Sequence, residues 1–214
     1  MPTSVEFERW AEKLTSREAA TRALYASWLS FHVGPEQVGL VPALTRALVN
    51  NGEDLDRLVR RYCAMALRRI GPPAASALPA LVETLECNFW PVRLAAIEAI
   101  LAIDVAESIP TSTIVRAIEQ TVRHDLQELQ RGIAAMELRQ FGPAAASAVP
   151  ALIELLTSPS KWARVAAATA LGCIGPGASA AIPALKLARG DAFEDVQEAA
   201  LTALKQISKA FVVR

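Results

Sequence analysis

Apolar and polar residues follow one another along the chain with the period of an α-helix. In the segment DLDRLVRRYCAMALRRIG, which begins at residue 54, the apolar residues Val59, Cys63, Ala66 and Ile70 are spaced three or four positions apart. This spacing places them on one face of a helix. Related segments follow at NFWPVRLAAIEAILAID, DLQELQRGIAAMELRQFG, SKWARVAAATALGCIG and AFEDVQEAALTALKQIS. The pattern predicts a series of amphipathic helices.

A second phrase recurs before most of these segments. It reads GPEQVGLVPALTRAL from Gly34, GPPAASALPALVETL from Gly71, GPAAASAVPALIELL from Gly142 and GPGASAAIPALKLAR from Gly175. With the degenerate copy IDVAESIPTSTIVRAI included, the shared prolines are Pro42, Pro79, Pro110, Pro150 and Pro183, which are 37, 31, 40 and 33 residues apart. A recurring period of this length indicates a solenoid of stacked repeats.

Glycine and proline also predict where each helix ends. A Gly after the second helix supplies a left-handed cap, and the Pro that follows prevents continuation of the helix. We therefore expect an all-α solenoid of about five to six stacked helix pairs, forming a single domain over 1–214. Residues 1–33 are expected to form capping helices, 34–208 the repeats and 209–214 a tail. The third unit is expected to be the least stable, because its opening phrase is degenerate and Gly132 lies inside its second helix.

Composition narrows the functional classes. Lys and Arg number 22, as do Asp and Glu, and the pI is about 6.8. This balance disfavours a dedicated nucleic-acid binder, which normally carries a basic excess. Cys63, Cys87 and Cys173 are far apart and are expected to be reduced thiols. The N-terminus has no signal-peptide pattern, and no apolar run approaches the roughly 20 residues that cross a bilayer. We expect a cytoplasmic protein without a membrane partner.

The phrases VRLAAIEAI and ARVAAATAL, together with the recurring proline, resemble HEAT repeats, specifically the short bacterial form also found in bilin lyases. The resemblance covers most of the chain, from Gly34 to Ile207. It implies a right-handed, armadillo-like superhelix that acts as a binding scaffold. It also implies that the arginine at one position of the second helices forms a hydrogen-bond ladder between repeats. In this chain that column contains Arg60, Arg93, Arg131 and Arg164.

Second helices line the concave side in this architecture, so their exposed positions are candidates for binding a partner. At about 100° per residue, Arg57, Arg61 and Arg68 fall on one stripe. Positions in neighbouring units extend this stripe, which then comprises Leu24, Phe31, Arg57, Arg61, Arg68, Trp90, Leu94 and Leu101. Arginine beside large apolar residues predicts a site for an acidic-apolar peptide or helix of another protein. Burial of Trp90, Leu94 and Leu101 between units, and self-association, are the alternatives.

Catalytic and cofactor motifs are missing from the sequence. Neither His32 nor His124 is followed by Glu, and no metal-binding, phosphate-binding or nucleophile-elbow motif occurs. Carboxylates at helix starts, such as Asp56 and Asp195, are expected to cap helices. We therefore expect a non-enzymatic adaptor without a cofactor or metal. The alternative is a bilin lyase or another tetrapyrrole-handling enzyme. A DNA glycosylase with stacking tryptophans is disfavoured by the neutral charge.

Overall fold

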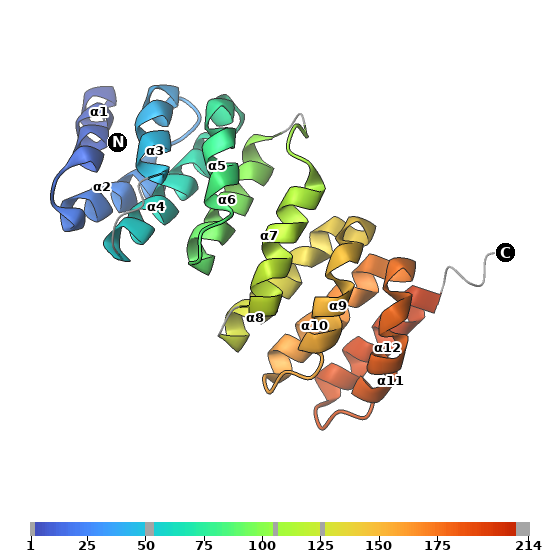
Figure 1. Ribbon diagram of the computed structural model, residues 1–214. Coiled ribbons are helices and arrows are strands. Elements are labelled where there is room, and N and C mark those ends of the chain that lie inside the picture. Colours follow the sequence, from blue (N-terminus) through green and yellow to red (C-terminus); the bar gives the residue numbers. More distant parts are fainter. Residues whose placement is uncertain (1–2, 50–53, 105–106, 125–126, 209–214) are drawn as a thin grey trace. The chain divides into compact units, whose positions relative to one another are not determined.

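The computed structural model describes residues 3–49, 54–104, 107–124 and 127–208, and every regular element in them is helical. Twelve α-helices in this part of the chain form six consecutive pairs (Figure 1). The expected all-α solenoid of helix pairs is confirmed. The chain divides into two compact units, Met1–Ile109 (unit 1) and Pro110–Arg214 (unit 2), each with three pairs. The predicted tail at 209–214 lies outside the described residues.

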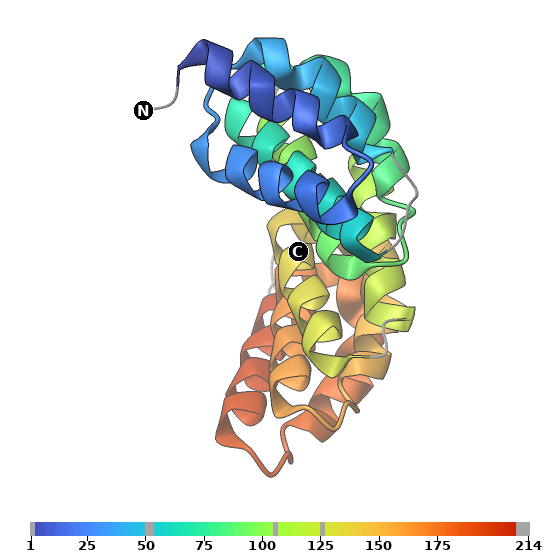
Figure 2. The same ribbon diagram turned by 90° about the vertical axis from the view of Figure 1, so that its left-hand side faces the viewer.

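Unit 1 contains two layers of helices. The first helices of its pairs are α1 (Ser4–Glu12), α3 (Val41–Leu48) and α5 (Leu78–Thr84). The second helices are α2 (Ala19–His32), α4 (Asp54–Ile70) and α6 (Trp90–Ile103). Helix α4 packs between α2 and α6, so the second helices form a layer of their own beside the first helices (Figure 2). Short 3₁₀ segments, η1 (Lys13–Thr15), η2 (Val38–Leu40) and η3 (Pro72–Ala77), join or extend these helices.

Unit 2 repeats this arrangement. Its first helices are α7 (Thr111–His124), α9 (Val149–Leu155) and α11 (Ile182–Ala188). Its second helices are α8 (Glu128–Leu138), α10 (Lys161–Ile174) and α12 (Glu194–Ser208), with α10 packed between the other two. The 3₁₀ segments η4 (Arg139–Ala148) and η5 (Gly175–Ala181) precede α9 and α11.

The Gly-Pro phrase produces a defined turn. Gly71, Gly142 and Gly175 have φ values of 72°, 49° and 72°, a region that residues with a Cβ atom rarely adopt. The chain then enters a 3₁₀ segment, and the second proline stands in the first turn of the following α-helix, where its missing N–H costs little. The degenerate copy lacks the phrase, and there a single 14-residue helix, α7, replaces the 3₁₀ segment and the short helix. At α5, α9 and α11 the phrase is therefore followed by a 3₁₀ segment and a short first helix of seven residues.

Leucine, isoleucine and alanine fill the core of each unit. Leu29, Leu44, Leu67 and Leu81 in unit 1 are fully buried, and burial of each such side chain stabilises the fold by about 1.5–3 kcal/mol. Alanines on the second helices let neighbouring helices approach closely. Glycine serves the same purpose at Gly132, where an added Cβ atom would lie 2.1 Å from Cζ3 of Trp162. Gly132 therefore makes room for the Trp162 ring of the next repeat.

One stretch of the described residues, Lys161–Ala188, is long and apolar enough by composition to cross a membrane. The sequence expectation that no run reaches this length is therefore wrong for these residues. In the structure the stretch consists of α10, η5 and α11, and 56% of its most apolar window is buried within the protein. Buried core helices meet the same criterion, so the stretch is weak evidence for a membrane segment.

Candidate functional site

The arginine column ties the second helices α6 (Trp90–Ile103), α10 (Lys161–Ile174) and α12 (Glu194–Ser208) to the loops that precede them. Arg164 donates from Nη1 to the carbonyl of Ser158 at 2.8 Å, and Arg93 donates in the same way to Cys87. Gln197, the one exception in the column, donates its side-chain amide to the carbonyl of Asp191 at 2.6 Å. In all three cases the acceptor lies six residues before the donor. The column therefore fixes the entry into the second helix.

Arg22 on α2, which the predicted column did not include, makes the same contact. Its Nη1 donates to the carbonyl of Ser16, six residues earlier, at 2.8 Å. The signal in the sequence that identifies Arg22 is its distance of six residues from the loop residue whose carbonyl it binds.

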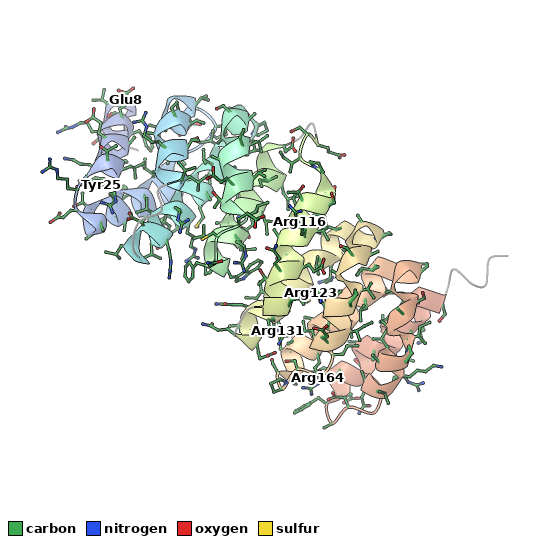
Figure 3. The ribbon with its side chains drawn as sticks, in the orientation of Figure 1. Glu8, Tyr25, Arg116, Arg123, Arg131 and Arg164 are labelled. Carbon is green, nitrogen blue, oxygen red and sulfur yellow. The ribbon has the colours of Figure 1, made fainter. Side chains whose placement is uncertain are left out.

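The other two column members are placed differently. Arg131 donates from Nε to the carbonyl of Val122 at 2.7 Å and pairs with Glu128 at 2.9 Å, so its bonds lie within one helix pair. Figure 3 shows Arg131 and Arg164 on the second helices of unit 2. Arg60 is half-buried near Thr84 and Cys87. A bond to the next repeat, as the resemblance implied for this column, is seen at Arg164, which pairs with Asp191.

Contacts between repeats come from ion pairs with carboxylates. Arg22 pairs with Asp56 of the next second helix at 2.6 Å, and Lys161 pairs with Asp195 at 2.8 Å. Each pair spans 34 residues. The expectation that Asp56 and Asp195 act mainly as helix caps therefore needs correction, because both carboxylates bind a cation of the preceding repeat.

Arg164 also reaches the next repeat. Its Nε and Nη2 donate to the two carboxylate oxygens of Asp191 at 2.7 and 2.9 Å. The bound guanidinium is the main cause that holds the pKa of Asp191 below its ordinary value, and the backbone N–H of Phe193 contributes. Both side chains are largely buried, with 12% and 13% exposed. This two-point pair is the best-defined connection between repeats in unit 2.

The N-terminal part of the predicted binding stripe is exposed. Leu24 and Phe31 on α2 are 58% and 61% exposed. Arg57 on α4 is exposed with its guanidinium 5.7 Å from the centre of the Phe89 ring. Arg61 is half-buried over Tyr62. Large apolar groups and cations therefore lie on neighbouring second helices of unit 1, as the sequence predicted.

The prediction for the remainder of the stripe is wrong at Trp90. This side chain is 2% exposed, so it contributes to the core and does not present a binding surface. Leu94 is half-buried and Leu101 is exposed. Arg68 is exposed and pairs with Glu98 of α6 at 2.8 Å, which neutralises part of its charge. The candidate surface that remains, here called the second-helix face, comprises Leu24, Phe31, Arg57, Arg61, Arg68, Leu94 and Leu101.

An aromatic cluster beside this face was not predicted as part of it. The Trp28 ring, 43% exposed, stacks on His32 with a centroid distance of 4.1 Å. Trp10 of α1 contacts Trp28 at 4.9 Å. Leu24, Trp28 and Phe31 are spaced as i, i+4 and i+7 on α2, a signal that could have added Trp28 to the stripe. The cluster enlarges the exposed apolar surface of α2.

A groove of about 780 Å³ lies between α1 and α3, on the first helices. Buried apolar residues, among them Leu14, Leu40 and Ala47, form its floor. Glu8 and Glu12 of α1 line one side and Arg46 of α3 also lines the groove. Sequence reasoning missed this groove, because it attended only to the second helices.

The described residues contain no group of three or more His, Cys, Asp or Glu side chains that could hold a metal ion. The cysteines in this part of the chain are free, and complete burial raises the pKa of the Cys63 thiol to about 12. A thiol in such a setting is inert as a nucleophile at neutral pH. The chemistry available on the second-helix face is therefore apolar contact, hydrogen bonding and charge pairing.

Solved structures with the same fold cover nearly the whole chain. An engineered protein is 23% identical with a TM-score of 0.65, covering 95% of this chain and 96% of its own. A designed armadillo repeat protein in complex with the peptide (KR)4 is 18% identical with a TM-score of 0.67, covering 94% and 99%. The complex of CpcE and CpcF of phycocyanin lyase from Nostoc sp. PCC7120 is 21% identical with a TM-score of 0.51, covering 97% and 78%. At these identities the likeness concerns the fold.

Comparison with curated proteins gave no match. The family model for HEAT repeats, in contrast, matches residues 7–101 and 115–205, which is most of the chain and includes helices of all six pairs. The chain therefore belongs to the HEAT-repeat family.

Proposed function

We propose that this protein is a non-enzymatic scaffold that binds another protein through the second-helix face of unit 1. The observation that carries the proposal is the exposure of Leu24 and Phe31 beside the cations of Arg57 and Arg61. Exposed large apolar side chains cost free energy in water, and contiguous patches of them usually mark interaction sites. Arginine and aromatic residues are also the types that dominate binding energy at protein interfaces.

The charge of this face indicates the chemistry of the partner. Arg57, Arg61 and Arg68 give it a positive character, and Glu98 offsets part of the charge of Arg68. An acidic peptide or helix with apolar anchors complements it. The designed armadillo repeat protein bound to (KR)4 supports peptide binding as a use of this fold. That peptide is basic, so the preference for an acidic partner rests on the arginines of this chain.

Photo-cross-linking tests the proposal. A photoreactive residue replaces Phe31 on α2 in one variant, and Leu187 on α11, which is 81% exposed, in a control. A protein captured from the native host at position 31 and not at 187 is the expected result. The Arg57→Glu/Arg61→Glu variant should lose that product. The matched variant Arg116→Glu/Arg189→Glu, with the same change in net charge on exposed arginines of unit 2, should keep it. Capture only at 187 contradicts the assignment.

Bilin lyase activity is the enzymatic alternative. Its support is the repeat pattern and the likeness to the phycocyanin lyase complex, whose TM-score is 0.51. Co-expression with a phycobiliprotein subunit and bilin separates the two functions, because a lyase produces covalently attached colour and a scaffold does not. Trp90 is buried and therefore cannot stack on a nucleobase as the DNA glycosylase alternative requires.

A further inference from the structure

Small residues line much of the groove between α1 and α3. Gly39, Ala43 and Ala47 stand at i, i+4 and i+8 on η2 and α3, and Ala11 lies opposite on α1. Eight residues of helix span about 12 Å, or a little more than two turns. Small side chains at this spacing leave a channel into which the ridge of another helix fits at a short interaxial distance. The groove therefore has the length and the relief that an additional α-helix requires.

The rim of the groove carries unpaired charges. Glu8 and Glu12 are exposed and stand one turn apart on α1, which Figure 3 shows with Glu8 labelled. Arg46 is exposed on α3. None of the three forms an ion pair with a described residue, unlike Arg22, Arg68 or Arg164 in the second-helix layer. Charged side chains on both sides of an apolar floor can orient a charged occupant as well as bind it.

We propose that the α1/α3 groove binds an amphipathic α-helix of a second protein partner, with lysine or arginine on the flank that faces Glu8 and Glu12. An acidic residue on the opposite flank of that helix faces Arg46. The apolar seam of the helix covers Leu14, Leu40 and Ala47, which form the floor. Two rim carboxylates against one arginine give the groove a net preference for a basic helix.

This inference does not depend on the proposed function. The groove lies on the first helices and prefers a basic occupant, whereas the second-helix face lies on α2, α4 and α6 and prefers an acidic one. A chain with both surfaces joins two different partners. If the experiment on one surface contradicts its proposal, the proposal for the other surface is unaffected.

The probe is a synthetic helical peptide with an Ala/Leu seam, lysines on one flank and glutamates on the other. Titration into the ¹⁵N-labelled full chain is followed by NMR. We expect saturable shifts confined to residues 8–15 and 39–49, with a Kd on the order of 10–100 μM. The Glu8→Lys/Glu12→Lys variant should weaken binding by about 10-fold, because two favourable pairs become repulsive. A peptide with the lysine flank replaced by glutamate should bind that variant better than it binds the unmodified protein.

Filling the groove provides a second, uncharged test. Ala43→Leu places a larger side chain in the channel and should weaken binding of the peptide by at least about 10-fold. Ala80→Leu is the matched control, because Ala80 follows Pro79 in α5 as Ala43 follows Pro42 in α3 and does not line this groove. The proposal is overturned by shifts that map to α2 and α4, by equal effects of the two leucine variants, by loss of the charge-swap rescue, or by no saturable shift up to about 1 mM peptide.

Discussion

Long polar side chains on the second helices act mainly on the loop that precedes each helix. Arg22, Arg93, Arg164 and Gln197 all donate to a carbonyl six residues earlier. A glutamine can replace the arginine because the contact needs a donor of sufficient reach and no charge. Arginine adds a second function where a carboxylate of the next repeat lies within range, as for Arg164 with Asp191.

Removal of Arg164 should therefore be costly. Arg164→Ala breaks a largely buried, two-point pair and leaves Asp191 unpaired, so the free energy of unfolding should fall by about 1.5–3 kcal/mol in denaturant titration. Arg57→Ala or Arg61→Ala on the second-helix face should change it by less than about 0.5 kcal/mol. Equal losses for the two groups would show that the buried pair has no special structural role.

Gly132→Ala should destabilise the protein, although alanine is the better helix former. The new Cβ atom would lie 2.1 Å from the Trp162 ring. The resulting strain of about 1–3 kcal/mol outweighs a propensity gain of about 1 kcal/mol, so a net loss of up to about 2 kcal/mol is expected in thermal or denaturant unfolding. Gly39→Ala, with nothing within 4 Å of its new Cβ atom, is the control. In a Trp162→Ala background the Gly132→Ala change should become neutral or stabilising.

Acid should remove the contribution of the Asp191 pair. The folded-state pKa of Asp191 is lowered by Arg164, so the pair stabilises the fold at pH values above the ordinary carboxyl range. That contribution disappears as the pH falls from about 4 through the lower folded-state pKa. The difference in unfolding free energy between the unmodified protein and Asp191→Asn should be largest at neutral pH and should shrink as the pH falls below the ordinary carboxyl range. A difference that persists in acid would assign the effect to packing.

At the scale of elements, the Gly-Pro phrase predicted helix boundaries because the backbone conformation that it requires depends only on neighbouring residues. A positive φ at Gly71 and a proline in the first helical turn depend on neighbouring residues alone, so the helix boundaries followed from the sequence. Burial depends on what packs against a helix. Periodicity placed Trp90 and Leu24 on the same stripe, yet Trp90 is buried and Leu24 is exposed. Sequence alone could not make that distinction.

The pair α7/α8 should open before the helices that follow it. Helix α7 lacks the preceding Gly-Pro turn and 3₁₀ segment, and α8 has 11 residues against 14 in α10 and 15 in α12. Hydrogen exchange measured by mass spectrometry should therefore show lower protection in α7 and α8 than in α9 to α12. First opening in α12, or uniform protection through unit 2, would count against this assignment.

For the whole molecule, the repeats account for the stability of the scaffold, whereas the candidate binding surfaces depend on residues that do not repeat. Each helix pair contacts mainly its neighbours, so stability is close to a sum of local terms. The sequence predicted this scaffold because the same physical solution recurs along the chain. The candidate surfaces depend on exposed residues that differ from one repeat to the next, such as Leu24 on α2 and Arg57 on α4, and a repeating pattern says little about such positions. The α1/α3 groove is the clearest example.

A partner on the second-helix face should protect unit 1 alone. Binding stabilises the helices that it contacts, here α2 and α4, and the gain passes to adjacent pairs with decreasing strength in a one-dimensional array. Hydrogen exchange of the full chain with and without the captured partner should show slower exchange in α2, α4 and α6, and unchanged exchange in α10 and α12. The complex should also weaken with added salt, because exposed arginines attract an acidic partner through a field that salt screens over about 10 Å. Equal protection of both units, or affinity independent of salt, would place the partner elsewhere on the chain.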